Sequence, residues 1–270
     1  MVDLDTFTVL TDSLVRVYIF VFLGMAIWLI SKYFPMKEYE NQKITLADYF
    51  FILTALMIAG VYELLITPAI QHIFKNFSDV HFFLSQTVDK WGLWFQIPAY
   101  LLVTDFLGYC FHRLMHSRLL WRLHAFHHSI QSLNWVSGVR GSPLHIFLVI
   151  LPSMLTSSIF LLTDQTVAFY VVVFFDICSQ HLTHSNVYLP YASKLERFLV
   201  TPRMHFIHHH IDERYGNSNF GFYFSIWDHL FGTYVNANGV NHRGQLGLTN
   251  NYSTTSLFWG MQLKEKASNK

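Results

Sequence analysis

Two short stretches share one histidine pattern: "WRLHAFHHSI", residues 121–130, and "PRMHFIHHHI", residues 202–211. Each contains His-x-x-His-His, so its histidines stand at positions i, i+3 and i+4. Residues with this spacing lie on one face of an α-helix. We therefore predict two helices that each present three imidazole rings to a common site.

Further histidines extend the pattern on both sides. "HRLMH" at 112–116 has two histidines at i and i+4, and "SQHLTHSN" at 179–186 has two more. Neutral imidazole is a common ligand of zinc, copper, iron and nickel ions. One ion does not need this many rings, so the pattern predicts a pair of metal ions. The predicted ligands are His112, His116, His124, His127, His128, His184, His205, His208 and His209, and at this point His181 beside His184 stays open. No catalytic side chain beyond these ligands is predicted.

The remaining histidines fit the pattern less well. His145 and His229 are interpreted as structural residues, and His210 is the ambiguous third member of a triplet, because only two of three adjacent rings share a helical face. The others lie outside the clusters: His72, His81 and His242.

The composition indicates an integral membrane protein that forms a single domain over residues 1–270. Hydrophobic residues make up 52% of the chain and charged residues 13%, against about 25% charged in soluble domains. The formal net charge of +1 gives no reason to expect nucleic-acid binding. Cys110 and Cys178 both lie in apolar runs, so neither a disulfide framework nor a cysteine-based zinc site is indicated.

Several apolar runs are long enough to enter a bilayer, since a helix needs about 20 residues to cross it. They cover residues 13–33, 46–68, 92–111, 144–162 and 166–180. The run 166–180 is short, and only three residues separate it from the run 144–162. We therefore predict an all-α, polytopic membrane protein. It has about four to five membrane-embedded helices and a helical cap that holds the histidine-rich dimetal site.

The charges at the first span predict the orientation. The connection after it carries Lys32, Lys37 and Lys43, whereas the tail before Arg16 has three aspartates and no basic residue. The positive-inside rule then places the tail outside and this connection in the cytoplasm. The tail lacks the basic region of a secretory signal, so the first span is expected to be retained. Following the spans puts every histidine cluster on the cytoplasmic face, of either the endoplasmic reticulum or a bacterial inner membrane.

Three segments give the chain a family resemblance. They are "DFLGYCFHRLMH" at 105–116, "WRLHAFHHS" at 121–129 and "TPRMHFIHHHIDERYGNSNFGFYFSIWDHLFGTY" at 201–234. With these motifs the chain resembles the membrane-bound fatty acid hydroxylase / sterol desaturase superfamily over residues 100–235, the expected catalytic region. Where that family has Asn-Tyr-Gly, this chain has Phe220 in place of tyrosine. Where some members have a histidine four residues before His184, it has Gln180, and His181 is shifted by one position. Ligation by Gln180 or His181 is left open.

The resemblance implies a function. It implies two iron ions held by the histidines and O2 as co-substrate. It also implies hydroxylation or desaturation of a C–H position in a membrane lipid of sterol or fatty acyl type. The chain contains no electron-transfer domain, so the electrons are expected from an external donor of the cytochrome b5, ferredoxin or reductase type. The lipid, the carbon that reacts and the oligomeric state are not readable from the sequence.

Further residues are expected to support such a site. Metal-bound imidazoles normally donate their second N–H to an acceptor that fixes the ring. The expected acceptors are Asp105, Asp228, Asn219 and Glu213. Arg113 and Arg140 are expected to pair with such carboxylates or with lipid phosphates, although a structural role is favoured for Arg140. The substrate is expected to enter along an apolar groove lined by Phe, Trp and Leu.

Two other classes of protein remain as alternatives. A histidine-rich metal transporter would need polar residues inside the spans, and the spans contain few, chiefly Glu63 and Asp176. A membrane zinc hydrolase needs only three protein ligands and an open position for water, which nine histidines exceed. Clusters gathered at one face favour a reaction centre over a conduit.

Overall fold

The computed structural model describes residues 4–36, 46–76, 90, 92–131, 133–160, 167–240, 245–250 and 252–261. Within these residues the regular structure is helical, apart from two isolated antiparallel bridges, Leu199 with Phe224 and His210 with Leu246. This agrees with the predicted all-α class. Residues 37–45, which carry two of the lysines used to predict the orientation, lie outside the described part, as do His81 and His242.

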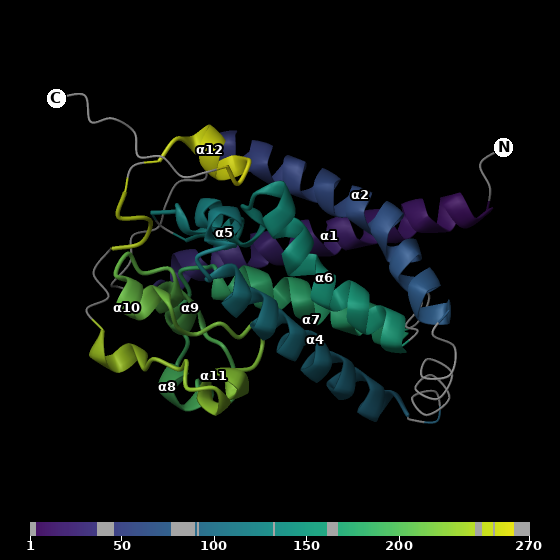
Figure 1. Cartoon of the computed structure of the whole chain (residues 1–270). Helices are drawn as coiled ribbons and strands as arrows, with labels where there is room; N and C mark the ends of the chain where they lie inside the picture. The colour runs from purple at the N-terminus through teal and green to yellow at the C-terminus, as the bar shows by residue number, and fades with distance from the viewer. Residues whose placement is uncertain are drawn as a thin grey trace.

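Five long helices form the body of the molecule: α1 (Leu4–Tyr33), α2 (Leu46–Asn76), α4 (Leu93–Met115), α6 (Pro143–Phe160) and α7 (Val167–Thr183). Among them, α6 packs against both α2 and α4, and α7 packs against both α1 and α4. The shorter helices gather at one end of this body (Figure 1). They are α5 (Trp121–His128), α8 (Ala192–Leu195), α9 (Pro202–His208), α10 (Glu213–Gly216), α11 (Ile226–Leu230) and α12 (Thr254–Phe258). Two 3-10 turns, Ser137–Val139 and Ala237–Gly239, complete this cap.

Two described helices have the length and composition of membrane spans. These are Val15–Tyr33 in α1 and Tyr49–Ile70 in α2, while Pro143–Ser158 in α6 is apolar but shorter. Only 6% of the apolar window of α2 is buried, so α2 is not the core helix of a soluble protein. A large exposed apolar surface of this kind is stable against lipid and unfavourable against water. The predicted number of four to five embedded helices remains a prediction beyond these two.

Helix α9 begins with a strong local signal. Thr201 is its N-cap, and its side chain accepts a hydrogen bond from the Met204 backbone N–H; Pro202 occupies the first turn. These are the residues preferred at such positions. The buried carboxylate of Glu196 accepts from the Thr201 hydroxyl at 2.8 Å and pairs with Arg203 at 2.6 Å. The start of α9 is therefore fixed before its histidines are reached.

A second contact holds α1 against the cap. The ring of His181 lies with Nδ1 3.0 Å from the Trp135 carbonyl oxygen and Nε2 3.0 Å from the Phe20 carbonyl oxygen. Gly24 lets the Trp135 ring approach α1, because a Cβ there would be 2.2 Å from a ring carbon. His181 thus joins α7, α1 and the segment after α5, and both of its nitrogens face carbonyl groups rather than other histidines.

This contact gives the first prediction. Gly24→Ala places a methyl group inside the Trp135 ring, and overpacking of this kind lowers the free energy of unfolding by about 1–3 kcal/mol. Gly60→Ala on α2 is the matched control, because a Cβ there meets nothing within 4 Å. We expect thermal unfolding in detergent to shift downward for Gly24→Ala only. Equal unfolding temperatures for the two variants would contradict the contact.

Candidate metal centre

All nine predicted ligands converge in the cap. They form two groups, and within each group the candidate ligand nitrogens lie within 4.8 Å of one another. The five-histidine group consists of His112, His116, His124, His128 and His208. The four-histidine group consists of His127, His184, His205 and His209. Eight of the nine side chains are buried, and His116 is half-buried. Histidines from four separate segments of the chain thus make one compact centre.

The repeated motif explains why there are two groups. On α5, His124 and His128 are four residues apart and join the five-histidine group, while His127 joins the other. The motif at α9 does the reverse: His205 and His209 join the four-histidine group, and His208 joins the five. Each His-x-x-His-His therefore contributes two rings to one group and one ring to the other, and the two short helices together link both groups.

The ring nitrogens face each other at short range. His184 Nε2 lies 2.8 Å from His205 Nε2 and 3.4 Å from His127 Nε2. In the five-histidine group, Nε2 of His124 and Nε2 of His128 are 3.0 Å apart. Two nitrogens bound to one ion at about 2.1 Å would lie roughly 3–4 Å apart. The spacing therefore fits nitrogens that share a metal ion.

The other ring nitrogen of several histidines is fixed by an oxygen acceptor from the segment after α10. His112 Nδ1 lies 2.8 Å from the Phe220 carbonyl oxygen, and His208 Nδ1 lies 2.7 Å from that of Ser218. His116 Nδ1 lies 3.1 Å from Asn217 Oδ1. A carbonyl oxygen only accepts, so each of these Nδ1 atoms carries the proton when Asn217 is oriented with its oxygen toward the ring. Nε2 then carries the lone pair that a metal needs.

The same arrangement recurs in the four-histidine group. His127 Nδ1 faces the Arg140 carbonyl oxygen at 3.0 Å, and His184 Nδ1 faces that of Gln180 at 2.8 Å. The Nε2 atoms of His127 and His184 thus present two lone pairs to each other, an arrangement that is repulsive unless a cation lies between them. Buried nitrogens with no hydrogen-bond partner among the described residues include His116 Nε2 and His208 Nε2. The donor set therefore fits a pair of metal ions.

His145 is a contributor that the sequence interpretation left among the structural residues. Its Nδ1 lies 2.9 Å from His124 Nδ1, and its ring stacks on that of His127. Gly141 gives it room, since a Cβ there would be 2.0 Å from the His145 ring. His145 belongs to neither group but touches one member of each. The spacing of the motifs gives no signal for it, because the contact depends on how the segment 133–142 returns to α5.

The side chains that were predicted as acceptors for the imidazoles bond instead to the backbone of the segment beside them. The Asp228 carboxylate accepts from the backbone N–H groups of Phe220 (2.8 Å) and Gly221 (2.9 Å), not from an imidazole. Asn219 has a left-handed backbone, with φ 54°, and its side chain bonds to backbone atoms of Met204 and Val235. These contacts shape the segment whose carbonyls face the histidines. The prediction that the two side chains accept directly from imidazoles is therefore wrong.

Asp105 holds the next part of the same segment. Its carboxylate accepts from the backbone N–H groups of three successive residues, 222 to 224, at 2.7–3.0 Å, and from the Trp227 indole N–H at 2.9 Å. Asp105 thus joins α4 to the segment without touching a histidine ring, contrary to the prediction. Glu213 stands exposed at the start of α10.

The two arginines both contact hydroxyl groups of the protein. Arg113 donates to the Tyr109 hydroxyl at 3.1 Å. Arg140 donates to the Ser129 hydroxyl at 3.0 Å, and its guanidinium lies 4.5 Å from the centroid of the Phe126 ring. Stacking of this kind stabilises packing. The structural role that was favoured for Arg140 agrees with these contacts.

The histidines left ambiguous lie outside both groups. His210 Nδ1 accepts from the Asp212 backbone N–H at 2.9 Å, and His229 Nε2 lies 3.1 Å from the Glu196 carbonyl oxygen. His72 is exposed on α2. Gln180 supplies its backbone carbonyl to His184, and its side chain lines the small cavity between the two groups. These positions separate the nine central histidines from the others that the structure describes.

Burial sets the protonation of the centre. It lowers the pKa of the imidazoles on and just after α5 and α9 well below the usual histidine value, and the neighbouring histidines lower the pKa further. The affected residues are His124, His127, His128, His205, His208 and His209. At neutral pH these rings are uncharged, which is the form that binds metal ions.

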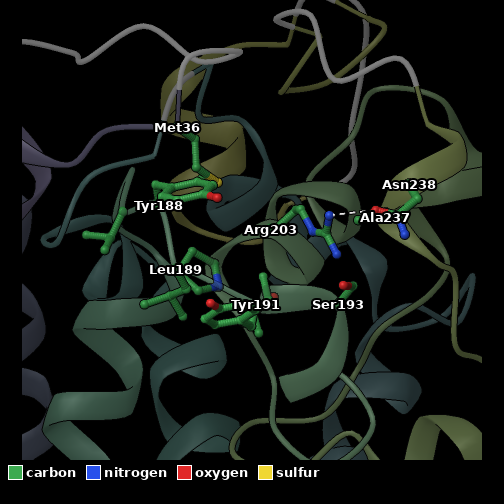
Figure 2. A pocket seen from close by; sticks show the side chains of 12 residues that line it. Met36, Tyr188, Leu189, Tyr191, Ser193, Arg203, Ala237 and Asn238 are labelled. Carbon is green, nitrogen blue, oxygen red and sulfur yellow. Dashed lines mark hydrogen bonds between the residues drawn. The ribbon is translucent and has the colours of Figure 1, made fainter.

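Three of the cavities that the described residues line lie in or beside the cap. One of about 30 Å³ lies between the two groups and is lined by members of both, including His112 and His184. A second, of about 270 Å³, adjoins it and extends among the long helices. A third, of about 340 Å³, lies beside α8 and α9, where Arg203 is held by Asn238 (Figure 2). None of the twelve residues that line the third cavity is a histidine.

Comparison with known proteins identifies the family. The profile of the family described as "Fatty acid hydroxylase" matches residues 97–233. The chain is 34% identical over 157 residues to the ornithine lipid hydroxylase OlsE of Rhizobium tropici, which covers 55% of this chain and 44% of that protein. It is 30% identical over 162 residues to the human alkylglycerol monooxygenase, covering 60% and 34%.

A sterol-modifying enzyme is also similar. The match to the Delta(7)-sterol 5(6)-desaturase of Gibberella zeae has 32% identity over 152 residues, covering 55% of this chain and 41% of that protein. The matched region is thus less than half the length of these relatives. No solved structure matches the chain. Because the family profile spans half of the chain and includes all nine converging histidines, the chain belongs to the fatty acid hydroxylase family.

Proposed function

We propose that this protein uses O2 and two iron ions to hydroxylate or desaturate a C–H position of a membrane lipid. The observation that carries the proposal is the convergence of nine buried or half-buried imidazoles in two groups, in a chain of this family. The named relatives act on an ornithine lipid, an alkylglycerol and a sterol. The common substrate class is a lipid, and the reactions named are oxidations.

Iron is favoured over zinc by the number of ligands. A catalytic zinc site has three protein ligands and an open position, whereas each group here offers four or five nitrogens. Imidazole suits iron as well as zinc. When bound, a pair of iron ions would supply the redox chemistry with O2 that no side chain in the cap can perform. The five-histidine group would hold one ion and the four-histidine group the other.

The residues of the chain have three tasks in this proposal. The backbone carbonyls of Phe220 and Ser218 keep the protons of His112 and His208 on Nδ1, so that Nε2 stays available. Burial keeps the rings neutral and limits access of bulk water to the centre. The helices α5 and α9 hold the rings in place, because Thr201 and Glu196 fix the start of α9.

The membrane arrangement follows the sequence prediction. We infer that α4, α6 and α7 enter the bilayer beside the two candidate spans and that the cap faces the cytoplasm. An external donor of the cytochrome b5, ferredoxin or reductase type would then deliver electrons from the cytoplasmic side. The membrane would be that of the endoplasmic reticulum or a bacterial inner membrane.

Metal content and O2 uptake test the proposal directly. We expect the purified protein to carry two iron ions, one for each histidine group, and to consume O2 when a reductant and lipid are supplied. Element analysis and an oxygen electrode measure both. Zinc without any O2 requirement would favour the hydrolase, and metal flux into vesicles without O2 uptake would favour the transporter; either result would exclude the proposed reaction.

Single histidine variants test the ligand assignment. His128→Ala and His208→Ala each remove a ring from the five-histidine group, so we expect turnover to fall below detection while the protein still inserts into the membrane. His72→Ala is the matched control, because His72 is exposed on α2 far along the chain from either motif. Mass-spectrometric product analysis measures turnover. Full activity in both His128→Ala and His208→Ala would refute the assignment.

Asn217 tests the role of the acceptors. Asn217→Leu removes the partner of His116 Nδ1, and the loss of such an acceptor weakens metal binding by about 10–100-fold. Competition with a chelator measures the affinity. Asn250→Leu, at an exposed asparagine that contacts Tyr252, serves as the control and should leave the affinity unchanged. Identical affinities in the two variants would show that the Asn217 contact does not orient His116.

A further inference from the structure

The cavity of about 270 Å³ adjoins the metal centre. It lies among α1, α2, α4, α6 and α7, and three of its lining residues also line the small cavity between the histidine groups: Val149, Gln180 and Phe222. The expectation was a groove lined by Phe, Trp and Leu. The apolar part of the lining is instead mainly Val, Ile and Met, and half of the lining residues have polar side chains.

The polar residues in this cavity are arranged around α4 and α7. The Tyr223 hydroxyl donates to Asp176 Oδ1 at 2.6 Å. The Tyr100 hydroxyl lies 3.0 Å from Ser157 Oγ and also donates to the Ser153 carbonyl oxygen at 3.3 Å. Ionisable and polar side chains among apolar helices are costly and usually serve a function. Asp176 and Tyr223 take no part in holding the histidine rings.

Two hydroxyls that line the cavity lack a hydrogen-bond partner among the described residues. They are Thr104 Oγ1 and Thr67 Oγ1. Thr104 is 1% exposed. Its hydroxyl lies close enough to the Tyr100 hydroxyl to interact with it, although the Tyr100 hydroxyl is also bonded to α6. Other hydroxyls on the long helices donate to the carbonyl oxygen four residues earlier: Thr54, Thr156, Ser158 and Thr183. Thr67 and Thr104 lack this bond to their own helix, so each hydroxyl can turn toward a ligand in the cavity, Thr104 beside the Tyr100 hydroxyl.

The charges of the lining restrict the ligand. Asp176 offers carboxylate oxygens that only accept hydrogen bonds, and Arg16 contributes a positive charge to the same cavity. The two opposite charges act against each other, so a carboxylate or phosphate group gains no net attraction from the lining. A hydroxyl or an amide can donate to the carboxylate and accept from Thr104. The lining therefore favours a neutral polar group that has both a donor and an acceptor.

The helices also set the distance from this polar group to the metal centre. On α7, Asp176 precedes His184 by eight residues, with Gln180 between them on the same face. On α4, Thr104 precedes His112 by eight residues. At 1.5 Å per residue, both polar side chains lie about 12 Å along their helix from a candidate ligand. The separation corresponds to a lipid segment of several carbon atoms.

We propose that this cavity binds a hydroxyl or amide group of the lipid substrate through Thr104 and Asp176 and thereby selects the carbon that reaches the histidine centre. The proposal rests on the proposed function for the statement that this carbon is oxidised. The binding step itself needs no metal ion and no O2, so it can be examined separately. Thr104 and Asp176 are thus residues that determine specificity, and the helices between them and the histidines set the register.

Binding of four probes of equal chain length tests the proposal. The probes are 1-dodecanol, dodecanamide, dodecanoate and dodecane, measured by retention on the full-length protein in lipid nanodiscs against empty nanodiscs. We expect the wild-type protein to retain the alcohol and the amide about tenfold or more over the alkane, the effect of one lost buried hydrogen bond. Thr104→Val should remove most of this preference. Asp176→Asn keeps one accepting oxygen but replaces the other with an N–H2 donor, so it should reduce the preference.

The control variant is Thr156→Val. It makes the same change at a buried threonine of α6 whose hydroxyl donates to Pro152 and which does not line the cavity, and it should keep the wild-type preference. Equal retention of all four probes, preference for dodecanoate, or unchanged preference in Thr104→Val would overturn the proposal. If Asp176→Asn does not fold, Thr104→Val decides alone. Selective binding without O2 uptake would count against the proposed function only; normal O2 uptake without selectivity would overturn the lipid subsite only.

Discussion

The hydrogen bond from a histidine Nδ1–H to a carbonyl oxygen is the interaction on which this structure depends. It decides which nitrogen of each ring carries the proton, and so which nitrogen points its lone pair inward. Where two such rings meet, as His127 and His184 do at 3.4 Å, the lone pairs repel each other. A protein that buries this arrangement gains nothing from it unless a cation is bound between the rings. The cap thus offers a place for positive charge that its own side chains do not supply.

The carbonyls in turn depend on carboxylates that never touch a ring. Asp228 fixes the backbone at Phe220 and Gly221, and Asp105 fixes the next three residues. Both carboxylates are fully buried, and each is compensated by several N–H donors, which buried charge requires. Because Asp105 lies on α4 two turns before His112, one helix carries both a ring and a residue that holds the segment just after the acceptor of that ring. The centre is therefore organised as a chain of contacts that begins in the helical body.

The sequence predicted the parts of this centre that depend on local periodicity. Spacing within a helix is enough to place His124 and His128 on one face and to bring His205 and His209 together, so periodicity alone suffices to name these candidate ligands. The all-α class followed from apolar runs in the same way. The roles of Asp105, Asp228 and His145 could not be predicted correctly, because they depend on where an irregular segment lies after folding. The acceptors of His112 and His208 are the backbone carbonyls of Phe220 and Ser218. Every residue has a backbone carbonyl, so the residue types in the sequence do not indicate which ones act as acceptors.

Gln180 shows how a departure from a motif can be interpreted once its neighbours are known. At the sequence level it stands where some relatives have a ligand, and a weak or water-mediated ligand was one interpretation. In the fold its carbonyl holds His184, a task that any residue at this position of α7 can perform, so its side chain is released to line both cavities. Its amide then stands between the polar lining at Asp176 and the histidine rings, one helical turn from each. Asp176, Gln180 and His184 follow one another at four-residue intervals on the α7 segment. Because a helix is rigid, these intervals do not change when the substrate enters. The segment can therefore fix the position of a flexible lipid more accurately than a loop could.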